Sequence, residues 1–477
     1  MDYHPEVRHA VLALLLGSSL IARAAQPPPG FRLETVVADA DYPAAFAFTP
    51  DGRLLYGELS SGRIRLVRDG VLQAQPFAVV PTEPHAGAGL LGLAVDPEFL
   101  DNGYVYVYHT APAPYQNRLT RLTARGDIGI EPKFIFTLPA GLQHNGGRIG
   151  FDRHGGLIVT YGENFDQPAA AQDLSSPLGK IHRITREGAP APDNPVPASS
   201  FYALGVRNSF GLDFHPITQL PYFSDNGPQA DDEINLLLPA ANYGWPSDTG
   251  PNANPAYSDP VVNLPRTIGI TGIAFYSGTR YPQELWNDLF YGEFNSGLIR
   301  RVRLSPPDYT AALEESIFVR GLEHVLEIRM APDGDLYLST PTTIYRLRPS
   351  FAADVSVPAP RFSSGAEILI AVGASNLDGP ARTVDVYLAL LDPAGALTLF
   401  DAALQPVAAD PLNPADFVAL LQAVTLPPGL DVQGLPLLSL AGLGLTEQPG
   451  IYSVALALTT PNTLAIEALD VARFEIR

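Results

Sequence analysis

One phrase of sequence recurs six times between Gly30 and Pro349, and this repetition limits the fold more than any other feature of the chain. Each copy has an apolar strand of alternating pattern, a turn rich in Pro, Asp and Gly, a second strand, and a strand that ends in arginine. Examples are "AAFAFTPDGRLLYGELSSGRIRLVRDG" and "EHVLEIRMAPDGDLYLSTPTTIYRLRP". Repeats of roughly 45–65 residues that each form a small antiparallel sheet are typical of a β-propeller. We therefore expect an all-β fold with a six-bladed β-propeller over residues 30–349.

The sequence after Ser350 has a different texture. Segments such as "AEILIAVGASN" and "GIYSVALALTT" alternate apolar and polar residues like sandwich strands, and the phrase that ends in arginine is absent. This part contains no histidine and no cluster of catalytic residue types. We expect residues 351–477 to form a small immunoglobulin-like β-sandwich, an accessory domain that packs on the propeller, binds a partner or acts as a spacer.

The N-terminal segment carries the features of a secretory signal. Arg8 and His9 precede an apolar run from Ala10 to Ile21, and Ala22–Arg23–Ala24 supplies a small-x-small cleavage pattern. The run is too short for an ordinary transmembrane helix, and no later segment is long and apolar enough to span a membrane. We expect residues 1–25 to be a signal peptide and the mature protein to be periplasmic or secreted.

Composition excludes several classes of function. The formal charge of −20 repels polyanions, so we expect no nucleic-acid partner. The chain has no cysteine, which excludes disulfides, thiolate nucleophiles and cysteine-bound metals. A metal would therefore be a hard cation held through oxygen.

The third repeat, "GLQHNGGRIGFDRHGGLIVTYGEN", combines a histidine, an arginine and a glutamate around two strands. If the strands pair in antiparallel fashion, His144 and Glu163 meet at one end of the sheet. A carboxylate that orients an imidazole is the arrangement of a general base, although solvated turn residues give the same local pattern. Arg148 lies at the start of a strand and is expected to be structural.

The fourth repeat offers oxygen ligands for a hard cation. The Asn226–Gly227–Pro228 turn precedes a short acidic loop at Asp231, Asp232 and Glu233. Calcium takes carboxylate and backbone oxygens from loops of this kind, and the nearby "NYGWP" turn adds further oxygens. The other interpretation of the acidic run is a solvated surface.

These motifs, in this order, resemble a known family. The chain is similar over residues 30–349 to the soluble pyrroloquinoline-quinone sugar dehydrogenases, the glucose/sorbosone dehydrogenase family that includes bacterial aldose sugar dehydrogenases. The motifs that carry the resemblance are "GLLGLAVDPEF", "HNGGRIGFD", "LGKIHRI", "GVRNSFGLDFHP", "NGPQADDEINLLLPAANYGWP" and "GLIRRVRL". The resemblance implies a six-bladed propeller that is exported to the periplasm and carries pyrroloquinoline quinone and calcium at one mouth of its channel.

The resemblance also implies roles for individual residues in sugar oxidation. His144 matches the base that removes the C1 hydroxyl proton of the sugar while hydride passes to the quinone, and Glu163 matches the carboxylate that orients this base. Arg207 and Asn208 match the pair that contacts the quinone, which His144 also touches. An aldose or related alcohol would be the substrate, and an external acceptor would take the electrons.

The metal positions follow from the same comparison of motifs. Gly227 and Pro228 match residues whose carbonyls hold the active-site calcium, with Asp232 nearby. Glu233 and Tyr243 match a second, structural calcium site. Calcium would polarise the quinone carbonyl while the neighbouring arginine stabilises developing negative charge.

The chain departs from the family pattern where the quinone carboxylates are usually neutralised. Gly87 replaces a polar residue, Asn295 stands where a lysine that contacts the cofactor is expected, and His324–Val325–Leu326 replaces an arginine pair. The family's "RNPQG" is "RNSFG" in this chain. Candidate substitutes for the missing cations are His85, His324, Arg329, Arg300 and Arg301.

Three hypotheses of function remain open from the sequence. The first is an exported quinoprotein that oxidises aldoses or related alcohols. The second is a calcium-stabilised propeller that has lost the quinone and binds a carbohydrate or a protein. The third is a metal-dependent hydrolase that uses the same histidine and carboxylates to activate water. The fold cannot separate them, because function resides in the site.

Overall fold

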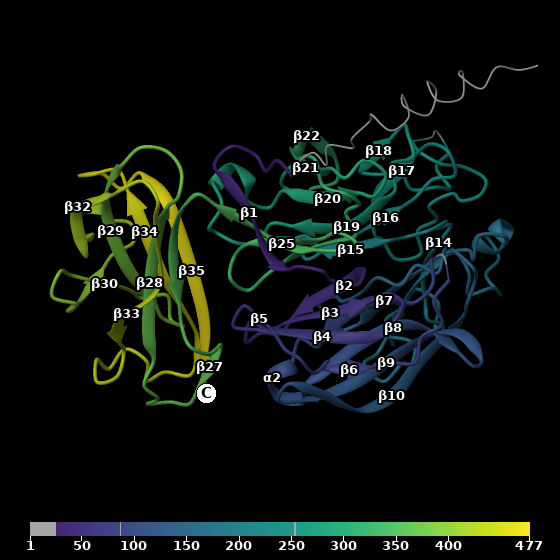
Figure 1. The fold of residues 1–477 in the computed structure, drawn as a ribbon, viewed down its shortest axis with the longest axis horizontal. Helices are drawn as coiled ribbons and strands as arrows, with labels where there is room; N and C mark the ends of the chain where they lie inside the picture. Colours follow the sequence, from purple (N-terminus) through teal and green to yellow (C-terminus); the bar gives the residue numbers. More distant parts are fainter. Residues whose placement is uncertain (1–24, 86, 252–253) are drawn as a thin grey trace, which may run out of the picture.

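The computed structural model describes residues 25–85, 87–251 and 254–477. Within these residues nearly all regular structure is β-strand (Figure 1). The helical elements are short and lie in connections: helix α2 (Phe99–Asn102) and the 3₁₀ segments η1 (Pro168–Ala171), η2 (Gln283–Leu285) and η3 (Pro414–Asp416). None of the described helices has the length and apolar character needed to cross a lipid bilayer.

The first three repeats each form one antiparallel sheet. Blade 1 contains β2 (Pro43–Phe48), β3 (Leu54–Glu58), β4 (Arg63–Arg68) and β5 (Val71–Leu72), with β6 (Ala78–Val79) also paired to β4. Blade 2 contains β7 (Leu90–Val95), β8 (Tyr104–Pro112), β9 (Tyr115–Arg125) and β10 (Ile128–Pro139). Blade 3 contains β11 (Ile149–Phe151), β12 (Leu157–Tyr161), β13 (Lys180–Ile184) and β14 (Phe201–Leu204).

The remaining repeats complete the ring. Blade 4 contains β15 (Gly211–Phe214), β16 (Pro221–Asp225), β17 (Asp232–Leu236) and β18 (Val262–Leu264). Blade 5 contains β19 (Ile270–Phe275), β20 (Leu289–Glu293), β21 (Ile299–Leu304) and β22 (Ala312–Val319). Blade 6 joins β23 (Glu327–Met330), β24 (Leu336–Ser339) and β25 (Ile344–Pro349) to the N-terminal strand β1 (Phe31–Val37).

This topology confirms the predicted six-bladed propeller. The innermost strands β2, β7, β11, β15, β19 and β23 contact one another in succession, and β23 contacts β2. Strand β1 pairs with β25 from Phe31–Pro349 onward, so the first and last strands of the ring share one sheet. Closure by a strand from the other end of the chain removes a free edge from the last blade.

The connections divide between the two ends of the propeller. Turns from the innermost to the second strand, such as Pro50–Asp51–Gly52 and Pro332–Asp333–Gly334, lie at what we call the hairpin end. Gly52 and Gly334 have φ of 84°, a conformation that glycine adopts without steric cost. Connections between blades, and those from second to third strands, lie at the opposite end, which we call the loop end. Long loops from different repeats therefore meet at the loop end.

Arg148 fills the centre of the ring. Its guanidinium donates to the carbonyls of Ala44, Leu91, Phe210 and Leu326, at 2.8 to 2.9 Å, which belong to blades 1, 2, 4 and 6 or directly precede them. It also lies 3.2 Å from a carboxylate oxygen of Glu327, and the side chains of Arg148 and Glu327 are each 1% exposed. The expected structural role of Arg148 is thus a cross-link on the propeller axis.

The chain after the propeller builds two further sheets. One contains β26 (Phe351–Ser356), β28 (Leu369–Asn376) and β33 (Leu430–Ser439). The other contains β27 (Arg361–Phe362), β29 (Arg382–Leu391), β30 (Leu397–Phe400), β31 (Pro406–Ala409), β32 (Leu421–Leu426), β34 (Gly450–Thr459) and β35 (Ile466–Ile476). One apolar cluster, with Ile370, Leu388 and Val454 fully buried, is formed by both sheets. An independent, immunoglobulin-like domain over residues 351–477 remains our proposal.

These two sheets pack against the hairpin end of the propeller, and Figure 1 shows β35 on the side that faces the propeller. Arg280, between β19 and β20, reaches Asp354 at 2.5 Å and Asp470 at 3.4 Å. On another side, Arg361 binds Asp101 in the α2 region at 2.7 Å. The C-terminal sheets therefore leave the loop end of the propeller uncovered.

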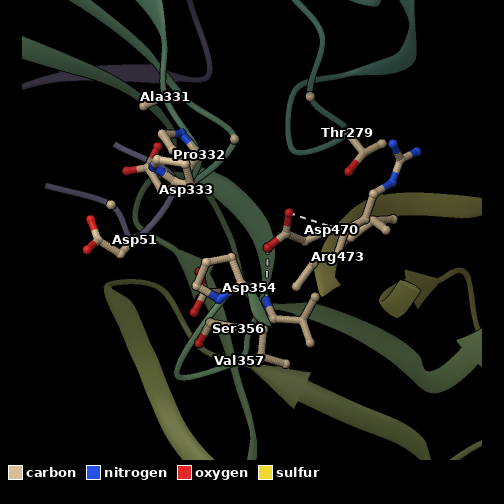
Figure 2. A pocket seen from close by; sticks show the side chains of 18 of the residues that line it. Asp51, Thr279, Ala331, Pro332, Asp333, Asp354, Ser356, Val357, Asp470 and Arg473 are labelled. Carbon is tan, nitrogen blue, oxygen red and sulfur yellow. Dashed lines mark hydrogen bonds between the residues drawn. The ribbon is translucent and has the colours of Figure 1, made fainter. Parts of the chain in front are cut away.

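A cavity of about 590 Å³ lies in this junction (Figure 2). Asp51, Thr279 and Asp333 line it from the propeller turns, and Asp354 and Arg473 line it from β26 and β35. Since these turns belong to the hairpin end, the cavity is separate from the predicted catalytic residues. The proposed signal peptide, by contrast, lies outside the described residues except for Ala25.

Candidate functional site

His144 and Glu163 form a buried pair at the loop end of blade 3. Strands β11 and β12 pair in antiparallel fashion, which brings the loop before β11 beside the loop after β12. His144 Nδ1 lies 2.7 Å from Glu163 Oε1, and the side chains are 9% and 1% exposed. Because a carboxylate accepts hydrogen bonds, Nδ1 carries the hydrogen of the neutral imidazole, whose Nε2 then has a free lone pair. The pair is thus arranged as a general base.

The loops that hold this pair are tightly packed and conformationally unusual. His144, Asn164 and Phe165 have φ of 56°, 62° and 74°, which are rare for residues other than glycine. A Cβ on Gly162 would lie 2.3 Å from the His144 carbonyl oxygen and 2.7 Å from that of Arg207, so only glycine fits between them. Left-handed residues of this kind persist where surrounding structure fixes them, and they concentrate at functional sites.

Asn145 anchors the His144 loop and was not singled out by the sequence. It is fully buried, and its side-chain amide donates to the carbonyls of Gly87 and Gly141 at 2.9 Å. Its Oδ1 accepts from Asn117 of β9 at 2.9 Å. Its position next to the proposed base was the only sequence signal for this residue.

Arg207 and Asn208 lie on the next inter-blade loop and are oriented by Asp225. Their backbone amides donate to the two Asp225 carboxylate oxygens at 2.8 and 2.6 Å. The Arg207 carbonyl accepts from the amide of Glu163 at 3.0 Å, which joins this loop directly to the histidine–glutamate pair. Burial raises the pKa of Asp225 to about 8. Asp225 is a second residue that sequence reasoning missed.

The Arg207 side chain is held at the surface of the same loop cluster. Its Nη1 donates to the carbonyls of Asn226 and Gly227 at 2.8 and 3.1 Å, and its guanidinium lies 5.3 Å from the ring centroid of Trp245. Both Arg207 and Asn208 are half-buried. The guanidinium is therefore held in place by carbonyls and an aromatic ring, on a loop whose backbone is hydrogen-bonded to Glu163.

Asp232 has a structural role in the acidic loop. One of its carboxylate oxygens accepts from the Gly227 amide at 2.8 Å, and the other accepts from the amides of Ile268 and Gly269, both at 2.7 Å. The side chain is fully buried, and burial raises its pKa. Since these amides use the carboxylate, Asp232 shapes the loop between blades 4 and 5, and we do not include it among proposed metal ligands.

Glu233 and Tyr243 line a small polar cavity of about 10 Å³, together with Asp225, Asp231, Asp248 and other residues. This is close to the space that one water molecule needs. Glu233 accepts from the amide of Gly250 at 2.5 Å and from Asn235 at 3.0 Å, and burial raises its pKa. The Tyr243 hydroxyl donates to the Leu236 carbonyl at 2.7 Å, which leaves the Tyr243 backbone oxygen as the possible ligand.

Pro228 is exposed next to this cavity. In the described part of the chain, no three or more His, Cys, Asp or Glu side chains are grouped as a metal site. A calcium ion here would therefore depend on backbone and amide oxygens as much as on carboxylates.

The positions that depart from the family pattern also lie at the loop end. Asn295 is exposed, and its amide donates to the Thr267 carbonyl at 3.3 Å. Leu326 is buried and presents only its carbonyl, to Arg148. Gly87 has φ of 86° and accepts from Asn145. None of these three side chains supplies a positive charge.

The candidate substitutes divide into two groups. Arg300, Arg301 and Arg329 each pair with a carboxylate of the surrounding blades. His85 and His324 are exposed at the loop end; His85 lies 3.7 Å from the exposed Glu83 carboxylate, and the His324 ring stacks on Phe294 with centroids 4.3 Å apart. Of these five candidates, the two histidines are therefore the ones placed to meet a ligand at this end.

Comparison with known proteins places this geometry in context. The family model described as Glucose / Sorbosone dehydrogenase matches residues 40–346. An uncharacterized Synechocystis protein is 30% identical over 353 residues, covering 65% of this chain and 84% of its own. The Escherichia coli protein named Aldose sugar dehydrogenase YliI is 27% identical over 342 residues, covering 66% of this chain and 91% of its own.

Solved structures agree with the match. A putative oxidoreductase (glucose dehydrogenase) from Thermus thermophilus is 34% identical, with a TM-score of 0.62, covering 67% of this chain and 100% of its own. The PQQ-bound aldose sugar dehydrogenase from Streptomyces coelicolor is 28% identical, with a TM-score of 0.60, covering 68% and 99%. The chain belongs to the glucose/sorbosone dehydrogenase family of β-propeller proteins.

Proposed function

We propose that this protein is an exported quinoprotein dehydrogenase that oxidises aldoses or related alcohols and passes the electrons to an external acceptor. The observation that carries the proposal is the His144–Glu163 pair. The Glu163 amide joins this pair to the Arg207 loop, and the propeller that holds both belongs to this family. Family membership supports a small sugar substrate. Signal-like residues 1–25 support periplasmic or secreted localisation.

The residues of the chain divide the work of oxidation. His144 Nε2 takes the proton of the sugar C1 hydroxyl, while Glu163 holds the imidazole by Nδ1 and stabilises the charge that forms on it. The Arg207 guanidinium, fixed on the neighbouring loop, would stabilise negative charge that develops on a bound acceptor. Bound pyrroloquinoline quinone supplies the two-electron acceptor for the hydride that leaves C1.

The reacting end of the site fits the quinone. Arg207 and Asn208 are half-buried, and Asn208 Oδ1 is buried without a hydrogen-bond partner among the described residues. His144, Arg207 and Asn208 would hold the redox end, and Asn295 would meet the opposite end. Because Asn295 brings no charge there, we expect the quinone to bind more weakly than it would beside a lysine.

The oxygen-lined cavity beside Glu233 fits a calcium ion. Glu233 and the Tyr243 carbonyl, which line this cavity, would hold a structural ion. The Gly227 and Pro228 carbonyls would serve an ion at the reacting end, where the Gly227 carbonyl also accepts from Arg207 at 3.1 Å. Asn226 Oδ1 is a buried oxygen with no hydrogen-bond partner in the described chain, which adds a possible ligand. Calcium at the reacting end would act as a Lewis acid toward a bound carbonyl.

The second candidate is a calcium-stabilised propeller that binds a carbohydrate or protein without quinone. The uncharged side chains of Gly87, Asn295 and Leu326, where the family pattern has polar or cationic groups, favour it. Residues 351–477 would in either case be an accessory domain. They contact the hairpin end and leave the loop end open to substrate.

Reconstitution of the mature protein with calcium and pyrroloquinoline quinone tests the choice. We expect a change in cofactor absorbance at micromolar concentrations, and reduction of a dye acceptor with members of an aldose panel. His144→Gln should keep cofactor uptake and lose dye reduction. Absence of cofactor uptake would reject the dehydrogenase and leave the binding module, whereas turnover of esters or lactones without quinone would identify a hydrolase.

A further inference from the structure

Phe165 is an exposed aromatic residue directly beside the proposed base. It follows Glu163–Asn164 in the blade 3 loop, and 57% of it is exposed. Its ring meets the His144 imidazole edge-on, with centroids 5.2 Å apart and an interplanar angle of 75°. A solvent-exposed apolar surface therefore lies in direct contact with the His144 imidazole.

Packing does not account for this position. Phe165 belongs to none of the apolar clusters of the described residues, and its φ of 74° is unfavourable for a bulky side chain. The loop holds it there: the Asp166 amide donates to the Asn164 carbonyl at 3.0 Å, and the Gln167 amide donates to Glu163 Oε2 at 3.4 Å. A strained conformation that keeps an apolar ring in water points to a function for the ring.

A second apolar side chain faces solvent on the neighbouring loop. Leu142 is 68% exposed and precedes His144 by two positions. The two loops touch, since a Cβ on Gly141 would lie 2.6 Å from the Asn164 Cβ. His144 thus lies on one of two touching loops, and each loop presents an exposed apolar side chain.

We propose that Phe165 is the platform on which the C–H face of a cyclic sugar rests while His144 Nε2 approaches its C1 hydroxyl. This inference rests on the proposed function and narrows its substrate class to aldoses in the pyranose form. A pyranose ring carries axial hydrogens on one face and hydroxyls around its rim, so an aromatic ring binds the face without competing for the rim. Acyclic polyols present no such face.

Substitution of Phe165 separates binding from chemistry. In the protein reconstituted with calcium and quinone, Phe165→Ala should raise KM for D-glucose about tenfold with kcat changed less than about twofold. Phe165→Trp should keep the wild-type KM. Phe134→Ala is the matched control, because Phe134 is 58% exposed on β10, away from the loop cluster, and packs near Arg118.

A direct binding measurement completes the test. The probe for saturation-transfer NMR is methyl β-D-glucopyranoside, which has no free C1 hydroxyl. We expect saturation transfer from the protein to this sugar in the wild type and in His144→Gln, and no transfer in Phe165→Ala. Equal KM values for Phe165→Ala and Phe134→Ala, or a fall in kcat alone in Phe165→Ala, would contradict the proposal that the Phe165 ring binds the sugar. Sugar contact at Phe165 without dye reduction would instead reject the dehydrogenase and retain the platform.

Discussion

His144 Nδ1 and Glu163 Oε1 lie 2.7 Å apart although the two residues are separated by a pair of antiparallel strands. The contact fixes which imidazole nitrogen carries hydrogen, and it leaves Nε2 as the atom that can take a proton. The Glu163 amide in turn donates to the Arg207 carbonyl, so the pair is hydrogen-bonded to the loop that precedes blade 4.

Glu163→Gln is expected to lower kcat for aldose oxidation by about 10²- to 10⁴-fold, because an amide that donates to Nδ1 selects the tautomer with hydrogen on Nε2. Steady-state kinetics of the reconstituted protein measures this effect. KM should change little. Unchanged kcat would show that the carboxylate does not orient the base.

Arg148→Met is expected to destabilise the propeller by about 3–5 kcal/mol, because it leaves four buried carbonyls without their donor and leaves the buried Glu327 carboxylate with Arg329 alone, 3.5 Å away. Urea unfolding followed by tryptophan fluorescence gives the change. Arg153→Met, at an exposed arginine, should change stability by less than about 0.5 kcal/mol. The double variant Arg148→Met/Glu327→Leu should recover part of the loss; no recovery would contradict a buried ion pair on the axis.

Calcium is expected to raise thermal stability through the cavity that Glu233 lines. When free calcium exceeds its Kd a hundredfold, the free energy of unfolding rises by about 2.7 kcal/mol, and a chelator reverses this increase. Calorimetry with and without calcium checks this. Glu233→Gln should abolish the gain, while Glu314→Gln, which removes an exposed partner of Arg303, should keep it. A gain that persists in Glu233→Gln would place the ion elsewhere.

Asn295→Lys is expected to tighten pyrroloquinoline quinone about fivefold, since one exposed charge pair contributes about 1 kcal/mol. Cofactor titration followed by absorbance measures the Kd. Gln219→Lys places the same charge at the exposed hairpin end and serves as the control. Equal affinities in the two variants would show that residue 295 does not face the cofactor.

The junction between propeller and C-terminal sheets is expected to weaken as pH rises. Burial raises the pKa of Asp470 to about 7, well above its ordinary value of 3.8. The folded state therefore holds this proton more tightly, and its contribution to stability is complete below about pH 3.8 and is lost as pH rises through 7. The loss is about 1.4 kcal/mol for each pH unit in that window.

Thermal unfolding between pH 4 and 8 measures this dependence. Asp470→Asn should flatten the decline in Tm, and Asp69→Asn, at an exposed position, should reproduce the wild-type curve. Identical curves for all three proteins would show that Asp470 does not titrate in this range.

The repeated phrase by itself determined the propeller. Alternation at period two, turn residues at fixed offsets and six copies of one unit are local properties, so they are readable along the chain. The same pattern predicted that His144 and Glu163 would meet, because antiparallel pairing of adjacent strands brings their ends together.

The tertiary structure decided which polar groups serve the site and which serve the fold. Arg148 is close to His144 in sequence yet binds the Leu326 carbonyl, 178 residues away, on the axis. The Asp232 carboxylate accepts hydrogen bonds from backbone amides and serves the fold. The Asp225 carboxylate orients the Arg207 and Asn208 amides and serves the site. Such assignments depend on ring closure, because closure brings carbonyls and amides of distant blades close together. A local pattern of residues does not predict these long-range contacts.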